Sequence, residues 1–302
     1  MKMNLFQLVA KIASKENIPV QNVMDSDWDY LIILDACRYD MFNDLYRQFL
    51  KKGTLKKVHS KGSDTLEWLK ANFKDYYEDI VYISANPYIN SITAVKGFKA
   101  LDHFGKIVDV WKFGWDERLG TVPPKNVTNT AKKWILKYPN KRMIIHYIQP
   151  HYPYIASNCK MDLDFNVKDE NREVGYRWVS ILRDKAGSFL CSKFVWRMTK
   201  SLGLSDPRAP LWRMNKLLGG KYASNDEKIY HYFRGNFEKL KELYRENLKI
   251  VLGEVSNLLK YLSGKVIITS DHGEGLGDSI LLHPPNLRIP ILTEVPWFEI
   301  EK

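Results

Sequence analysis

Acidic residues and histidines stand where three apolar segments of this sequence end. Asp35 ends the first segment, His151 follows the second, and the pair Asp271-His272 ends the third. Because the carboxyl ends of parallel strands meet at one edge of a sheet, we expect these residues to lie close together. Two carboxylates with an imidazole suit a divalent cation, and the nitrogen ligand favours Zn²⁺ or Mn²⁺ over Ca²⁺ or Mg²⁺. The sequence therefore predicts a metal site that contains Asp35, Asp271 and His272, and it leaves open whether one ion or two are bound.

The elements that position these residues alternate along the chain. Short apolar runs predict strands over 29–35, 55–59, 79–85, 142–148, 265–270 and 288–294. Helical spacing of apolar residues predicts helices over 39–52, 63–73, 126–138 and 236–262. This alternation is typical of an α/β fold with a mostly parallel central sheet and helices on both faces. We expect residues 1–302 to form one domain, which is an ordinary size for this fold class.

Two segments depart from this pattern. Residues 158–235 are polar, basic and rich in arginine and tryptophan, and we interpret them as a helical insertion that could form a lid beside the site. Residues 1–19 have the spacing of an amphipathic helix, and we expect no signal peptide there. We also expect no membrane span, since no run of about 18 apolar residues occurs. The three cysteines form no paired pattern, which favours a reducing, cytoplasmic setting.

The net charge of +11, from 46 basic and 35 acidic side chains, favours anionic partners. Phosphorylated metabolites, lipid head groups and nucleic acid all belong to this class, and many basic proteins bind none of them. No nucleic-acid-binding motif accompanies the arginines and tryptophans of the insertion. We therefore expect an anionic ester as the substrate and no nucleic-acid partner.

Three motifs in this sequence resemble those of the alkaline phosphatase/sulfatase superfamily. ILDACRYDMF at 33–42 is similar to its first strand followed by D-x-x-R-x-D, and QPHYPY at 149–154 to its P-H-x-P-Y segment. SDHGEGLGD at 270–278, with His283, is similar to its D-H-G-E-x-x-G…H signature. The set resembles the phosphoethanolamine and phosphoglycerol transferase branch and archaeal sulfatase-like hydrolases. The resemblance implies an alkaline phosphatase-like fold and an enzyme that acts on phosphate or sulfate esters.

The resemblance also implies roles for single residues. Asp35, Asp271 and His272 match the metal ligands of the family. His151 and His283 match histidines that contact the anionic oxygens of the substrate or its leaving group, or that bind a second ion in two-metal members.

Two further residues lie in or near these motifs. Arg38 either clamps an oxyanion of the substrate or forms an ion pair with Asp40. His146 lies two residues before the expected end of its strand, and we interpret it as a core histidine.

Two hydroxyl groups are candidates for the nucleophile. The family places a nucleophile at a helix N-terminus, where the helix dipole and a metal stabilise an alkoxide. Ser63 and Thr65 both open the helix predicted over 63–73, so we expect one of them to attack the substrate and the other to act as the N-cap.

Two departures from the sulfatase pattern favour phosphate over sulfate. The chain has no C-x-P-x-R motif, and Leu34 stands where sulfatases usually have an acid next to Asp35. Cys37 is too close to Asp35 to supply the nucleophile, and we interpret it as a buried small side chain. We therefore predict a metal-dependent hydrolase or transferase of phosphate monoesters or diesters with a Ser or Thr nucleophile. The alternatives are a sulfatase without formylglycine and an inactive binding protein of the same fold.

Overall fold

The computed structural model describes residues 18–156, 193–202, 205–217, 225–234 and 236–302. Its centre is a seven-stranded sheet with the strand order β2-β9-β6-β1-β5-β3-β4. The strands are β1 Tyr30–Leu34, β2 Thr54–His59, β3 Tyr77–Ser84, β4 Phe104–Asp109, β5 Arg142–Tyr147, β6 Lys265–Thr269 and β9 Glu294–Glu301. Strand β9 runs antiparallel to both of its neighbours, and the other strands run in one direction. The predicted mostly parallel α/β sheet is confirmed.

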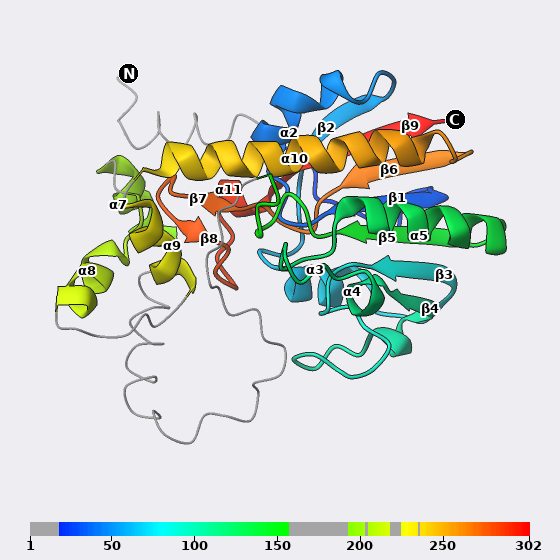
Figure 1. Cartoon of the computed structure of the whole chain (residues 1–302), viewed down its shortest axis with the longest axis horizontal. Helices are drawn as coiled ribbons and strands as arrows, with labels where there is room; N and C mark the ends of the chain where they lie inside the picture. The colour runs from blue at the N-terminus through cyan, green and yellow to red at the C-terminus, as the bar shows by residue number, and fades with distance from the viewer. Residues whose placement is uncertain (1–17, 157–192, 203–204, 218–224, 235) are drawn as a thin grey trace, which may run out of the picture.

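Helices cover both faces of this sheet (Figure 1). One face packs against α2 Tyr39–Leu45, α5 Pro124–Lys137 and α10 Phe237–Leu259, and the other against α3 Thr65–Asn72. Strand β1 lies in the middle and is buried along its whole length. Its side chains alternate between the two cores: Ile32 faces the core with α10, and Ile33 faces the core with α3. A strand buried on both faces needs apolar residues throughout, which explains the uninterrupted apolar run.

Two predictions about the elements need correction, and one strand was not predicted. The helix predicted over 39–52 is shorter, because α2 ends at Leu45 and a 3₁₀ turn, Tyr46–Gln48, follows. The strand predicted over 288–294 is wrong: a short helix, α11 Pro290–Thr293, lies there, and β9 begins only at Glu294. Proline suits the first turn of a helix, where its missing N–H costs no hydrogen bond. Strand β4 was not predicted, because glycine and lysine interrupt its short apolar run.

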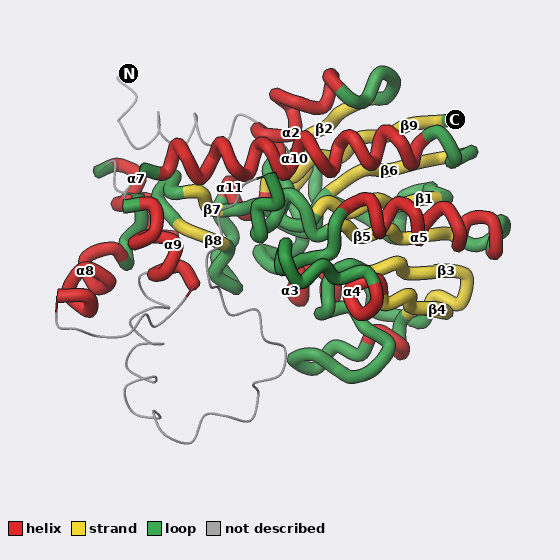
Figure 2. Tube along the Cα trace, in the orientation of Figure 1, coloured by secondary structure: helices red, strands yellow, loops and turns green. Residues whose placement is uncertain are grey.

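Helices of the predicted insertion gather near the first turns of α10 (Figure 1). They are α7 Lys193–Ser201, α8 Ala209–Leu217 and α9 Asn225–Phe233. The loops that follow the parallel strands lie between the sheet and these helices (Figure 2). Within the described ranges, no helix is long and apolar enough to cross a membrane. Most of the predicted helix at 1–19, part of the insertion, and Cys159 and Cys191 fall outside the described residues.

Candidate active site

The candidate site lies at the carboxyl edge of the sheet, where the sequence places its acids and histidines. Asp35 follows β1, His151 follows β5, and Asp271 and His272 follow β6. Backbone hydrogen bonds continue beyond the strand ends, since the Asp35 N–H donates to the Tyr147 carbonyl at 3.1 Å and the His151 N–H donates to the Asp35 carbonyl at 3.2 Å. These bonds fix the loops after β1 and β5 relative to the sheet. The predicted convergence is confirmed by His272 Nε2, which lies within 3.7 Å of carboxylate oxygens of both Asp35 and Asp271.

Four side-chain atoms from Asp35, Thr65, Asp271 and His272 face one another at the centre of the site. Thr65 Oγ1 lies 2.7 Å from Asp271 Oδ2 and 3.4 Å from His272 Nε2. His272 Nε2 is in turn 3.5 Å from Asp271 Oδ2 and 3.7 Å from Asp35 Oδ1. All four side chains are buried. These four separations, from 2.7 to 3.7 Å, bracket the roughly 3.3 Å between the ligands of a tetrahedral ion bound at about 2.0–2.1 Å.

The protonation of this cluster also fits a cation. His272 Nδ1 lies 2.8 Å from the Gly273 carbonyl, which can only accept, so Nδ1 carries the proton and Nε2 keeps its lone pair. Asp271 Oδ1 accepts from the backbone N–H groups of Ala36 and His272, which leaves Oδ2 for the centre. Two carboxylates this deeply buried require a compensating positive charge. The residues present therefore fit a divalent metal ion.

Thr65, and not Ser63, is the hydroxyl that belongs to this cluster. Thr65 is the first residue of α3, whereas Ser63 Oγ donates to Glu67 Oε2 at 3.1 Å. The N-cap is Asp64, whose side chain accepts from the Glu67 N–H. The prediction that Ser63 or Thr65 caps the helix is therefore wrong, because the carboxylate between them takes that position. The N-terminal end of the α3 dipole points positive charge at the Thr65 oxygen.

Asp35 has partners on its second carboxylate oxygen as well. Asn86, which follows β3, donates to Asp35 Oδ2 at 2.7 Å, and His146 Nε2 lies 3.4 Å from the same oxygen. Burial opposes the charge of Asp35, but the neighbouring imidazoles of His146, His151 and His272 hold its pKa below the ordinary value. The sequence prediction missed Asn86, although its position directly after a strand is the signal that identified the other residues.

A second cluster lies beside the first and consists of His151, Glu274 and His283. One ligand atom from each of these residues lies within 4.8 Å of the others. His283 Nδ1 is 3.1 Å from Glu274 Oε1, and its ring centroid is 4.3 Å from that of His272. Burial disfavours a protonated His283, yet the neighbouring Glu274 carboxylate raises its pKa to about 9. Glu274 stands inside the DHGE motif, but the sequence alone assigned it no role.

Arg38 forms the ion pair that was one of its two predicted roles. Its guanidinium lies 2.6 Å from Asp40 Oδ2 and 2.5 Å from Asp278 Oδ2, and its side chain is 8% exposed. The described residues that line the pocket of the site do not include Arg38. Its position ties the loop after β1 to the loop after β6, rather than presenting a charge to a ligand.

Helix α10 holds three loops of the site through residues spaced three apart. Lys241 Nζ lies 2.7 Å from Asp278 Oδ1 in the loop after β6. Tyr244 OH donates to the Ala36 carbonyl at 2.7 Å in the loop after β1. Asn247 accepts from the Ile155 N–H at 2.8 Å and donates to the Pro153 carbonyl at 2.8 Å in the turn after β5. One face of one helix therefore sets the relative positions of the loops.

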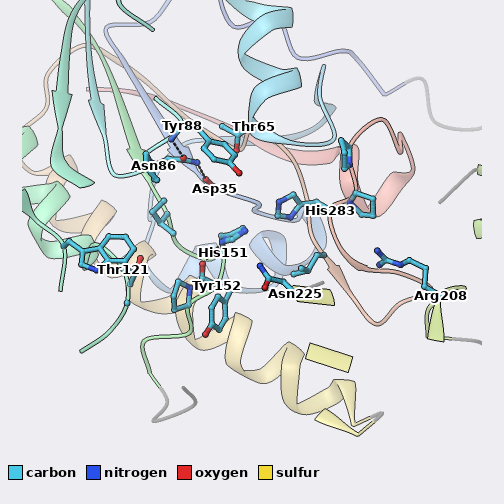
Figure 3. Close-up of a pocket in the computed structure, with 18 residues that line it drawn as sticks. Asp35, Thr65, Asn86, Tyr88, Thr121, His151, Tyr152, Arg208, Asn225 and His283 are labelled. Carbon is cyan, nitrogen blue, oxygen red and sulfur yellow. Dashed lines mark hydrogen bonds between the residues drawn. The ribbon is translucent and has the colours of Figure 1, made fainter. Parts of the chain in front are cut away.

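A pocket of about 510 Å³ opens in front of these clusters. In Figure 3, Asp35, His151 and His283 lie between Thr121 on one side and Arg208 on the other. The wall beyond the polar residues is largely apolar and aromatic, and it includes Pro87, Tyr88, Trp115, Ile148, Tyr152, Pro153 and Leu282. The cavity has room for an organic group attached to an anion at the polar centre.

No family model matches this sequence, and no curated protein is similar to it. Solved structures are similar in fold at low sequence identity. A putative sulfatase from Bacteroides thetaiotaomicron is 13% identical over 92% of this chain and 65% of its own, with a TM-score of 0.51. The soluble domain of lipooligosaccharide phosphoethanolamine transferase A from Neisseria meningitidis is 14% identical over 94% of this chain and 83% of its own, with a TM-score of 0.46.

A protein of the alkaline phosphatase superfamily from Vibrio parahaemolyticus is also similar, at 9% identity over 100% of this chain and 70% of its own, with a TM-score of 0.46. Identities this low are evidence of fold alone. The chain has an α/β fold similar to that of the putative sulfatase structure.

Proposed function

We propose that this protein is a metal-dependent enzyme that transfers or hydrolyses phosphate esters, with Thr65 as the nucleophile. One observation carries the proposal: the Thr65 hydroxyl completes a buried cluster with Asp35, Asp271 and His272 whose spacing suits a tetrahedral ion. Zn²⁺ or Mn²⁺ fits this mixed oxygen and nitrogen set better than Ca²⁺ or Mg²⁺.

The surroundings of Thr65 suit nucleophilic attack on phosphorus. A divalent ion bound in the cluster supplies positive charge that favours the alkoxide and offsets charge on the phosphoryl oxygens. Asp271 Oδ2 accepts a hydrogen bond from the Thr65 hydroxyl at 2.7 Å and orients it. The N-terminus of α3 adds its partial positive charge at the same oxygen. Attack in line with the departing oxygen would form the bond from Thr65 Oγ1 to phosphorus as the bond to the departing oxygen breaks, with the Thr65 proton passing to Asp271 Oδ2. Water or an alcohol would then take the phosphoryl group from Thr65.

The second cluster is suited to assist the departure of the leaving group. His283 is oriented by its hydrogen bond to Glu274, and both His151 and His283 line the pocket. In this proposal they contact the anionic oxygens, and His283 donates a proton to the departing oxygen. The three residues are also a donor set for a second ion, and the metal content of the protein distinguishes the two roles.

A threonine nucleophile favours phosphate over sulfate. Without the C-x-P-x-R motif the chain has no cysteine to convert to formylglycine, and Cys37 is buried under the site. Sulfate esters therefore serve as the comparison substrate in the test.

The test combines metal analysis with a matched pair of variants. Elemental analysis of the purified protein should find about one or two equivalents of a divalent ion. Activity should appear with p-nitrophenyl phosphate or bis-p-nitrophenyl phosphate and exceed that with p-nitrophenyl sulfate. Thr65→Ala should lose activity on the order of 10³-fold or more, while Ser63→Ala, its buried neighbour outside the cluster, should keep it.

Mass spectrometry of enzyme quenched during turnover should place a phosphoryl group on Thr65. Full activity in Thr65→Ala, or the absence of bound metal from the wild type, would refute the proposal. Turnover of the sulfate ester alone would keep the site and overturn the choice of phosphate.

A further inference from the structure

Two buried polar side chains behind Asp35 have no role in the chemistry above. Tyr82 on β3 and His146 on β5 are both 0% exposed. The Tyr82 hydroxyl lies 2.8 Å from His146 Nδ1, and His146 Nε2 lies 3.4 Å from Asp35 Oδ2. We propose that Tyr82 and His146 form a hydrogen-bond relay that positions Asp35, so that Asp35 presents only Oδ1 to the metal ion. The relay rests on the metal site proposed above.

The tyrosine hydroxyl determines which group donates and which accepts in each hydrogen bond of the relay. Among the described residues, the hydrogen-bond partner recorded for the Tyr82 hydroxyl is His146 Nδ1 alone. Buried hydroxyl groups rarely leave their proton unpaired, so the Tyr82 O–H donates and Nδ1 accepts. A neutral imidazole that accepts at one nitrogen carries its proton on the other. His146 Nε2 therefore has an N–H, and within the described residues it has no hydrogen-bond partner of ordinary geometry.

Asp35 Oδ2 is the acceptor that this N–H faces. The same oxygen already accepts from Asn86 at 2.7 Å, so protein donors surround Oδ2. The other oxygen, Oδ1, faces His272 Nε2 at 3.7 Å and belongs to the metal cluster. The two oxygens are thus divided between donors on one side and the cation site on the other. Such a division fixes the orientation of a ligand before the ion arrives.

A different role for His146 would be that of a metal ligand. One ligand atom from each of Asp35, His146 and Asp271 lies within 4.8 Å of the others. A ligand needs a lone pair on Nε2, which would move the proton to Nδ1 and leave the Tyr82 hydroxyl proton without an acceptor. The four atoms from Asp35, Thr65, Asp271 and His272 also complete a tetrahedral set without His146. The geometry therefore favours positioning over ligation.

Variants of His146 separate the two roles through metal affinity, measured by competition with a chromogenic chelator for Zn²⁺. His146→Gln puts an amide N–H close to the place of Nε2–H and cannot bind metal through nitrogen, so the relay predicts nearly wild-type affinity. His146→Leu has no donor, and we expect its affinity to fall by about 10- to 100-fold. Equal losses in both variants would overturn positioning in favour of ligation, and no loss in His146→Leu would overturn the relay.

The tyrosine has a matched control on the neighbouring strand. Tyr147 is also buried and its hydroxyl lies 2.9 Å from Thr128 Oγ1, away from Asp35. Tyr82→Phe should weaken Zn²⁺ binding severalfold, and Tyr147→Phe should leave it unchanged. Equal effects of the two substitutions would reduce Tyr82 to a structural role and refute the relay.

Nitrogen-15 spectra of histidine-labelled wild-type protein test the relay even if a variant fails to fold. The His146 signal, assigned by its loss in a folded His146 variant or by its contacts to Tyr82, should report a protonated Nε2 with and without Zn²⁺. Loss of the Nε2 proton on zinc binding would refute the proposal. Wild-type protein that binds no Zn²⁺ would refute the metal site itself. That outcome is distinct from Zn²⁺ binding whose affinity does not change when His146 is substituted, which would refute only the relay.

Discussion

Asn247 offers the sharpest test of how the site is held, because one side chain supports a whole turn. It is 0% exposed on α10, and its Oδ1 accepts from the Ile155 N–H at 2.8 Å. Its Nδ2 donates to the Pro153 carbonyl at 2.8 Å and lies 3.2 Å from the His151 carbonyl. Asn247→Leu keeps the number and branching of the side-chain heavy atoms and removes every one of these hydrogen bonds.

The expected cost follows from the groups left behind. A buried backbone group without its partner costs about 1–3 kcal/mol. The Ile155 N–H and the Pro153 carbonyl make the two shortest bonds, so Asn247→Leu should lower the free energy of unfolding by about 2–6 kcal/mol. Native domains have only about 5–15 kcal/mol in total, so this loss is measurable by urea denaturation.

The same substitution should separate catalysis from metal binding. Because the turn carries His151, its displacement should reduce kcat by up to about 10²-fold. Asp35, Asp271 and His272 are held by other contacts, so Zn²⁺ affinity should change little. Asn257→Leu is the matched control: it changes an exposed asparagine of the same helix and should shift stability by no more than about 0.5 kcal/mol. Equal stability of the two variants, or loss of zinc with retained turnover, would refute the reasoning.

Three further predictions concern charge. Glu274→Gln removes the carboxylate that raises the pKa of His283 to about 9. His283 should then lose its proton at a lower pH, and the alkaline limb of the pH profile of kcat should shift to lower pH. An unmoved limb would argue against proton donation by His283. Arg38→Met removes the buried cation that pairs with Asp278, which keeps its second partner Lys241, and it should destabilise the fold by on the order of 2 kcal/mol in urea denaturation; a smaller loss in high salt would show that screening dominates. Stripping the metal with a chelator should abolish turnover and lower the Tm, since Asp35 and Asp271 then lack a cation, and Zn²⁺ should restore both.

The sequence predicts those parts of the site that depend on local signals. An uninterrupted apolar run predicts a strand buried on both faces, and a polar residue at its end predicts a position at the carboxyl edge. This reasoning placed Asp35, Asp271 and His272 together. In the structure, one carboxylate oxygen of Asp35 and one of Asp271 lie within 3.7 Å of His272 Nε2. Their role as metal ligands stays a prediction.

The remaining features depend on tertiary contacts or on competition between neighbouring residues. Asp64 and Thr65 are both suitable helix caps by residue type, and only the direction of each side chain decides that Asp64 caps α3 while Thr65 turns to Asp271. Asn247 looks like any polar residue of an amphipathic helix, because its partners lie 92 or more positions away. The segment 288–294 likewise gave a strand prediction, whereas Pro290 in fact begins a short helix there.

The regular spacing of Lys241, Tyr244 and Asn247 along α10 has a consequence for communication within the molecule. These residues connect a single helix, which acts as a rigid rod, to the loops after β6, β1 and β5. A shift of the rod along its axis would move all three loops together, whereas a disturbance of one loop would be resisted by the other two. Helix α9 lies just before the start of this rod and carries Asn225, which lines the pocket. A displacement of α9 would therefore reach these three loops through α10 as a common displacement.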